Sequence, residues 1–142
     1  MEFYLKMKKL KPEAKMPTYA HPGDVGMDLY SLESYILKPG ERRIFFVGFA
    51  LEFPEGYGAF VMDKSSTSKA GLKTMGGVFD AGYRGEYNVG LINLSDADYV
   101  IERGDKLAQL VFLPVMIINP IEVDELNTTS RGTGSFGSTG KK

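Results

Sequence analysis

Two aspartates lie where a glycine-containing turn meets an apolar, β-type stretch. Asp80 lies in GGVFDAGYRGEYNVGL (residues 76–91). A carboxylate at such a strand end could activate a water for attack on phosphorus, with Tyr83 packed against a ligand. Asp28 lies in PGDVGMDLYS (residues 22–31) and could hold magnesium on phosphates, directly or through water. The alternative for both is structural, with Asp80 as a hydrogen-bonding turn residue and Asp28 as an ordinary turn acid.

A serine-rich stretch, DKSSTSKAGL at residues 63–72, could bind an anion. Lys64, the hydroxyls of Ser65 and Ser66 and the first N–H groups of a short helix would form the cradle. The alternative is a polar turn and helix cap, which is a common arrangement. Further along, Gln109 interrupts the apolar run in RGDKLAQLVFLP (residues 103–114). A buried glutamine must be hydrogen-bonded, so it either fixes neighbouring backbone, the favoured interpretation, or faces a ligand.

The C-terminal stretch has a different composition. From Thr128 to Gly140, eleven of thirteen residues are glycine, serine or threonine, and the exceptions are Arg131 and Phe136. One interpretation is a flexible tail. The other is a nucleotide clamp, in which hydroxyl and N–H groups surround phosphates, the arginine adds a forked donor and the phenylalanine stacks on a flat ring. The segment alone leaves both open.

The elements that position these residues alternate with a period of two. Strands are expected at 3–7, 43–53, 57–62, 86–94, 99–101, 107–113 and 116–123, separated by glycine-containing or polar turns. Residues 76–91 are expected to form a β-hairpin, and one short helix is expected at 66–70, capped by a serine and closed by Gly71. Several strands without a long amphipathic helix predict an all-β jelly roll or barrel.

Composition narrows the functional classes. The length of 142 residues predicts one domain, at 1–126, and the glycine-, serine- and threonine-rich composition predicts a tail at 127–142. The net charge of −1 predicts no bulk attraction to nucleic acid or an anionic membrane. The absence of cysteine excludes thiolate metal sites and a cysteine nucleophile, and it favours a cytoplasmic setting. No apolar run has the length of a membrane span, and residues 1–10 do not read as a secretory signal.

The order and content of these stretches resemble a known family. PGDVGMDL, KSSTSKAGL, GGVFDAGYRGEYNVGL, RGDKLAQLVF and RGTGSFGSTG resemble the five motifs of the trimeric dUTP nucleotidohydrolases (dUTPases), over residues 17–140. The resemblance implies a homotrimer of jelly-roll, β-clip subunits whose sites each draw on three chains. It also implies hydrolysis of dUTP to dUMP and pyrophosphate with Mg²⁺ on the triphosphate, which would limit uracil in DNA and supply dUMP for dTMP synthesis.

The resemblance also implies a role for each matching residue. Asp80 would orient the attacking water, Tyr83 would exclude a 2′-hydroxyl, and Asp28 would hold the hydration shell of the metal. Backbone groups of the 80–90 hairpin would read the edge of uracil. The remaining residues implied are Lys64, Ser65, Ser66 and Gln109 beside the phosphates or the water, Asn88 on the uracil side, Arg131 on the γ-phosphate, Phe136 over the uracil, and Gly137, Ser138 and Thr139 around the phosphates.

Some positions depart from the family pattern. Lys64 replaces an arginine and loses its bidentate fork, and Ser66, Asn88 and Ser135 each replace a common glycine. The related dCTP deaminases share the fold and an Asp-x-Gly-aromatic-x-Gly turn, but they need a glutamate where this chain has Gly90. A dUTPase is therefore favoured over a deaminase or a bifunctional enzyme. A non-catalytic module that binds deoxyuridine nucleotides is the alternative from another class, and the retained motif residues argue against it.

Overall fold

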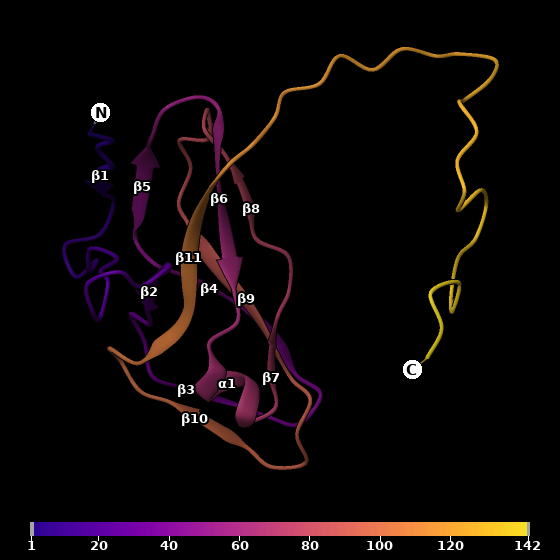
Figure 1. Cartoon of the computed structure of the whole chain (residues 1–142). Coiled ribbons are helices and arrows are strands. Elements are labelled where there is room, and N and C mark those ends of the chain that lie inside the picture. Colours follow the sequence, from indigo (N-terminus) through magenta and orange to yellow (C-terminus); the bar gives the residue numbers. More distant parts are fainter. Residues whose placement is uncertain (1, 142) are drawn as a thin grey trace.

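The computed structural model describes residues 2–141, which form an almost entirely β body and an extended C-terminal segment (Figure 1). The prediction of an all-β chain with one short helix is confirmed over these residues. The strands are β1 (Lys6–Lys9), β2 (Gly26–Tyr30), β3 (Tyr35–Leu37), β4 (Arg42–Phe46), β5 (Phe49–Glu52), β6 (Tyr57–Met62), β7 (Leu72–Thr74), β8 (Val78–Asp80), β9 (Asn88–Asn93), β10 (Tyr99–Ile101) and β11 (Lys106–Pro114), and the helix is α1 (Ser65–Lys69).

Two antiparallel sheets carry the residues of interest. One has the order β2-β11-β6-β8 and the other has the order β4-β9-β7. Two further pairs, β1 with β5 and β10 with β3, complete the body. The core lies between these sheets, and its largest fully buried side chains include Tyr87, Phe45 and Phe49. β11 pairs with both β2 and β6, and consecutive residues on both of its faces are buried, which explains why its sequence is a nearly continuous apolar run.

The strand predicted at 43–53 is divided by Gly48 into β4 and β5. Gly48 has φ = +77°, and a Cβ at this position would lie 2.8 Å from Cδ1 of Leu32, so only glycine fits the corner. The predicted inward face is nevertheless correct, because its five members are all buried: Phe45, Val47, Phe49, Leu51 and Phe53.

Other local predictions were wrong. The first strand begins at Lys6 rather than residue 3, and no strand forms at 116–123, where the chain is exposed and irregular. Residues 76–91 do not form a paired hairpin, because β8 pairs with β6 while β9 pairs with β4 and β7. The helix has Lys64 at its N-cap without a side-chain capping hydrogen bond, so a serine cap is wrong, whereas Gly71 closes it at φ = +88° as expected.

The segment after Val115 leaves the body. The N–H of Val115 donates to the carbonyl of Gly56 at 2.8 Å, and the chain then runs outward, away from both sheets (Figure 1). Residues 116–141 are all exposed. The segment lacks partners within the described part of its own chain that would bury its apolar residues.

Candidate active site

Asp80 and Tyr83 lie on one tight turn. Asp80 is the last residue of β8, where it is paired in register with Gly58 of β6, and its side chain is exposed. The N–H of Tyr83 donates to the carbonyl of Asp80 at 3.0 Å, which closes the turn. The Tyr83 hydroxyl donates to the carbonyl of Glu86 at 3.1 Å, and the phenol crosses Gly85 so closely that a Cβ there would collide with it. The sheet and the turn together fix the backbone positions of Asp80 and Tyr83 relative to each other.

An aromatic stack supports this turn from the core side. The rings of Phe79 and Tyr87 stack with centroids 4.2 Å apart, and the centroids of the Tyr83 and Phe79 rings are 5.5 Å apart. Tyr87 is fully buried and its hydroxyl has no hydrogen-bond partner among the described residues. Burial raises the pKa of Tyr87 to about 12, with smaller contributions from Tyr83 and Asp80. The phenol therefore stays neutral and packs as an apolar ring beneath the turn.

The two arms that leave the turn separate into different sheets. β8 has only β6 as a partner, and the Asn88–Val89 end of β9 pairs with β4 on one edge while β7 begins its pairing at Leu91. The backbone groups of β8 and β9 therefore do not pair with each other, although the two strands flank the same turn. Free N–H and C=O groups on such edges are suited to reading hydrogen bonds at the rim of a flat ring.

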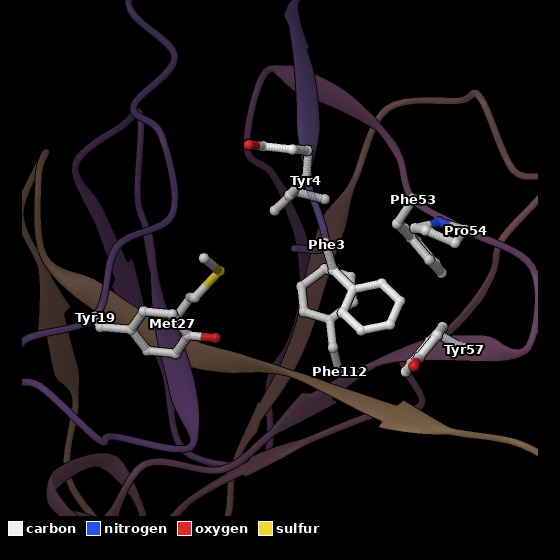
Figure 2. Close-up of a pocket in the computed structure, with 9 residues that line it drawn as sticks. Phe3, Tyr4, Tyr19, Met27, Phe53, Pro54, Tyr57 and Phe112 are labelled. Atoms are coloured by element: carbon white, nitrogen blue, oxygen red, sulfur yellow. The ribbon is translucent and has the colours of Figure 1, made fainter. Parts of the chain in front are cut away.

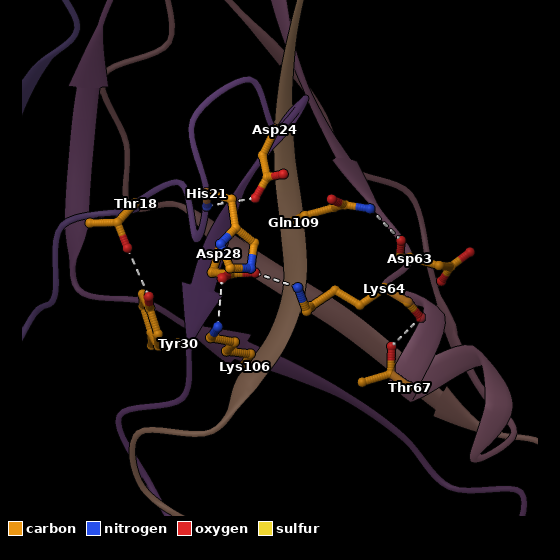
Figure 3. Close-up of polar contacts among 10 residues, drawn as sticks. All are labelled: Thr18, His21, Asp24, Asp28, Tyr30, Asp63, Lys64, Thr67, Lys106 and Gln109. Atoms are coloured by element: carbon orange, nitrogen blue, oxygen red, sulfur yellow. Dashed lines mark hydrogen bonds and ion pairs between the residues drawn. The ribbon is translucent and has the colours of Figure 1, made fainter.

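A second group of predicted residues gathers at the other end of β6. Asp28 of β2 is buried, with its side chain only 3% exposed, and it forms ion pairs with Lys64 and with Lys106, the latter at 2.9 Å (Figure 3). We call these three residues the Asp28–lysine cluster. Burial raises the pKa of Asp28, but hydrogen bonds and the charges of both lysines outweigh it and lower the pKa overall. The carboxylate is thus held ionised.

Lys64 leads directly into α1, which presents Ser65 and Ser66 to solvent. Gln109 lies beside them, and its Nε2 donates to the carbonyl of Asp63 at 2.8 Å (Figure 3). It therefore fixes the backbone that enters the helix, as the favoured interpretation expected. Its Oε1 lies against Gly26, where a Cβ would collide with it. The ammonium groups of the Asp28–lysine cluster thus lie near the exposed hydroxyls of Ser65 and Ser66.

Within one chain, these two groups lie apart. Asp80 is paired with Gly58 near the start of β6, whereas Asp63 and Lys64 follow its end. At about 3.3 Å per strand residue, the separation along β6 is about 17 Å. The predicted tail residues lie in a third region, the exposed segment after β11. There Arg131 Nε donates to the carbonyl of Gly134 at 3.0 Å, and the Phe136 ring is fully exposed. The other tail residues predicted to bind, Gly137, Ser138 and Thr139, lie in the same exposed segment.

Sequence reasoning missed Lys106. Its pairing with Asp28 arises from the irregular register of β11 against β2, where a shift occurs between Lys106 and Ala108. A lysine at the first position of an otherwise apolar strand was the only available signal. Arg84 was also missed, although it directly follows the Asp80–Tyr83 turn and its side chain donates to backbone carbonyls of that turn.

The residues present fit a metal that arrives with phosphates rather than one held by the protein alone. Among residues 2–141, no three or more histidine, aspartate or glutamate side chains are grouped to hold a metal ion. Mg²⁺ is commonly bound through one or two carboxylates together with substrate phosphates. Asp28 is the predicted carboxylate, but both its oxygens are paired with lysines here, so direct coordination would require a lysine to move.

Comparisons with known proteins agree on one family. A family model described as dUTPase matches residues 12–140. A deoxyuridine 5′-triphosphate nucleotidohydrolase of Clostridium tetani is 43% identical over 143 residues, covering 99% of each chain, and one of Thermobifida fusca is 44% identical over 140 residues, covering 96% of this chain and 78% of the relative.

Solved structures agree with the sequence relatives. The dUTPase of Staphylococcus bacteriophage 80alpha with dUpNHpp has a TM-score of 0.90 at 30% identity and covers 96% of this chain and 98% of its own. A variant dUTPase from phage phi11 of S. aureus, reported to coordinate a structural Mg(II) ion, has a TM-score of 0.81 at 29% identity. It covers 88% of this chain and 99% of its own. The jelly-roll, β-clip prediction and the predicted hydrolase class are confirmed. The chain belongs to the dUTPase family.

Proposed function

We propose that this protein hydrolyses dUTP to dUMP and pyrophosphate, with Asp80 orienting the water that attacks the α-phosphorus. Membership of the dUTPase family supports dUTP hydrolysis. The observation that carries the assignment of roles is the turn that fixes Asp80 and Tyr83 at the end of β8, with both side chains exposed. Asp80 forms no side-chain hydrogen bond or ion pair with another described residue, so its oxygens are free to accept a proton from water.

Selection of the sugar and the base would use the same turn. The Tyr83 ring is 38% exposed and presents its face where the sugar of a nucleotide beside Asp80 would pack. It would leave no room for a 2′-hydroxyl and would thereby reject UTP. The separating backbone edges of β8 and β9 would hydrogen-bond to uracil, with Asn88 beside it. They would reject cytosine, whose amine places a donor where uracil has an acceptor.

We propose a homotrimer in which each site is completed by more than one chain. A general base must lie within hydrogen-bond reach of its water, yet the Asp28–lysine cluster, with Ser65, Ser66 and Gln109, lies about 17 Å from Asp80 along β6. Closed rotational symmetry would bring this phosphate-binding surface of one copy to the turn of another. The clamp at 127–142 would supply Arg131, Phe136, Gly137, Ser138 and Thr139 to the same nucleotide.

Exposed apolar surface supports assembly. A hollow of about 300 Å³ is lined by aromatic and apolar side chains that include Phe3, Tyr57 and Phe112 (Figure 2). The segment after β11 also exposes large apolar residues: Met116, Ile117, Ile118, Ile121, Val123 and Leu126. Apolar surface of this extent is what a permanent oligomer buries. Within residues 2–141 there is no helix with the length and apolar content of a membrane span.

Mg²⁺ is the proposed cofactor, carried on the triphosphate with Asp28 contacting its hydration shell. When bound, it would neutralise phosphate charge that otherwise repels an incoming nucleophile. Lys64 and Lys106 already place two positive charges at this surface, and Arg131 would add a third. The cysteine-free sequence supports a cytoplasmic setting as part of the same proposal.

The test of the reaction is pyrophosphate release from dUTP with magnesium, measured in parallel with dCTP, dTTP and UTP. We expect release from dUTP only. Ammonia release from dCTP would instead support the deaminase alternative, against which Gly90 argues because it brings no carboxylate to the base. Tight binding of dUTP without release of either product would support the non-catalytic module.

The shared site has its own test, which uses two inactive chains. One is truncated after Asn127 and keeps Asp80, and the other is full-length Asp80→Ala with an intact clamp. Refolded together, they should regain activity well above the sum of the separate preparations, because some sites would combine Asp80 from one chain with the clamp of another. Mixed trimers confirmed by mass without regained activity would place base and clamp on the same chain.

A further inference from the structure

Arg84 is an exposed basic residue that directly follows the turn carrying Asp80 and Tyr83. Its Nη1 donates to the carbonyl of Ala81 at 2.7 Å and to the carbonyl of Tyr83 at 3.2 Å. Its Nη2 lies 3.9 Å from Oε2 of Glu52, at the end of β5. The guanidinium therefore folds back onto the turn.

We propose that Arg84 is a positioning residue that braces this turn and thereby sets the relative placement of Asp80 and Tyr83, rather than a phosphate ligand. The inference rests on the proposed function, because the placement matters through the water and the sugar that these residues would contact. In a site for a triphosphate, an exposed arginine would ordinarily be assigned to the phosphates. Here its charge is directed at backbone carbonyls of its own turn.

The geometry suits an arginine better than a compact cation. Nη1 alone donates to the carbonyls of Ala81 and Tyr83, while Nη2 faces Glu52 at 3.9 Å, so two nitrogens of one planar group reach three acceptors. The planar fork of arginine suits several fixed acceptors, whereas the ammonium of lysine is a compact point charge on a flexible stem. Together with the hydrogen bond from Tyr83 N–H to the carbonyl of Asp80, these contacts close the turn over four residues.

Burial does not explain the contact. The Arg84 side chain is 53% exposed, and an exposed ion pair such as that with Glu52 contributes little to stability. The brace should therefore affect the geometry of the turn far more than the stability of the fold. A displacement of about 1 Å at a reacting group can lower a rate by about 100-fold, so a small loosening is measurable in catalysis.

The experiment compares Arg84→Met and Arg84→Lys with Arg103→Met, a matched loss of one positive charge at an exposed residue of the turn between β10 and β11, outside the turn that carries Asp80 and Tyr83. In Arg84→Met we expect kcat/KM for dUTP to fall by about tenfold, mainly through kcat, and the preference for dUTP over UTP to fall as well. Arg84→Lys should restore little of either, because one ammonium nitrogen cannot occupy the positions of both Nη1 at the carbonyls and Nη2 beside Glu52. Arg103→Met should match the parent protein in both measurements.

Binding without turnover separates a brace from a phosphate ligand. If Arg84 is a brace, Arg84→Met should weaken the binding of dUMP and of a non-hydrolysable dUTP analogue by the same factor, and the salt dependence of binding should be unchanged. A loss that grows with the number of phosphates and is restored by Arg84→Lys would overturn the proposal, as would unaltered kinetics in Arg84→Met.

A nucleotide-free measurement keeps this result independent of the proposed reaction. Amide hydrogen exchange at Tyr83, whose N–H is bonded to Asp80, should quicken by about tenfold in Arg84→Met and stay unchanged in Arg103→Met. Unchanged exchange would refute the brace even if the protein hydrolyses dUTP. Faster exchange in a protein without dUTP hydrolysis would leave the brace standing and remove the proposed function instead.

Discussion

The two aspartates that the sequence singles out occupy opposite surroundings. Asp28 is buried and paired with Lys64 and Lys106, so its charge is compensated before any ligand arrives. Asp80 is exposed at a strand end, with its backbone fixed by β6 and its carboxylate unpaired among residues 2–141. The same residue type is thus used once to arrange cations and once to remain available to a reactant. Placement in the fold, more than residue type, separates the two roles.

The largest expected effect comes from removing the free carboxylate. Asp80→Asn should lower turnover by about 100-fold to about 10,000-fold, because an amide cannot accept the proton from water. Thermal stability and oligomeric mass should match the parent protein, since the side chain is exposed. Near-normal turnover in a verified Asp80→Asn preparation would contradict the assignment of the base.

A smaller effect is expected from the ring beside it. Tyr83→Ala should lower the dUTP preference, measured as the ratio of kcat/KM for dUTP to that for UTP, by about 10-fold to about 100-fold, because the space for a 2′-hydroxyl opens. Tyr83→Phe is the control, since it keeps the ring and loses only the hydrogen bond to Glu86. If the ratio is the same in the parent and Tyr83→Ala proteins, another residue excludes the ribose.

Replacement of the paired aspartate should lower stability as well as remove the proposed contact with the hydration shell of Mg²⁺. Asp28→Asn leaves two lysines without their common partner and should lower the free energy of unfolding by about 1–3 kcal/mol in urea denaturation. The combined variant Asp28→Asn with Lys106→Met should lose less than the sum of the single changes, because the partners interact. Strict additivity would show that the cluster is not a coupled unit.

The smallest expected effect is a dependence of stability on acid. The pKa of Asp28 is lowered in the folded chain from its ordinary value of 3.8, so the unfolded chain takes up the proton first. The contribution of the cluster is therefore fully present above about pH 4 and is lost as the pH falls through the lower folded pKa. Urea midpoints followed from about pH 6 to about pH 3 should drop less steeply in Asp28→Asn than in the parent protein. Equal slopes would separate Asp28 from the acid response.

Much of the body could be predicted from alternation alone. The strands at 57–62 and 99–101 were placed at their observed bounds, and the buried face from Phe45 to Phe53 was correct in every member. These successes have a common cause, because half-buried strands must alternate apolar and polar side chains. The short helix and its closing glycine were predicted from a different local signal, the serine-rich stretch followed by Gly71.

The errors lie where the outcome depends on distant partners. Residues 116–123 have the composition of a strand, but they pair with no strand of the described residues, and the segment is irregular and exposed. The arms of residues 76–91 are adjacent in sequence yet pair in different sheets, which no local pattern reveals. The pairing of Asp28 with Lys64 and Lys106 likewise joins β2, the start of α1 and β11, which only the folded sheet brings together. The roles predicted for Asn88, Arg131 and Phe136 stay predictions.

The turn between β8 and β9 is also one of the covalent connections between the two main sheets (Figure 1). The positions of Asp80 and Tyr83 therefore depend on both sheets being assembled at once. Partial opening of either sheet would abolish activity while most strands still contribute to a spectroscopic signal, so activity would be the more sensitive gauge of damage to the fold. Substitutions far from the nucleotide, in β4 for example, would then reduce the amount of competent enzyme without altering the properties of each remaining site.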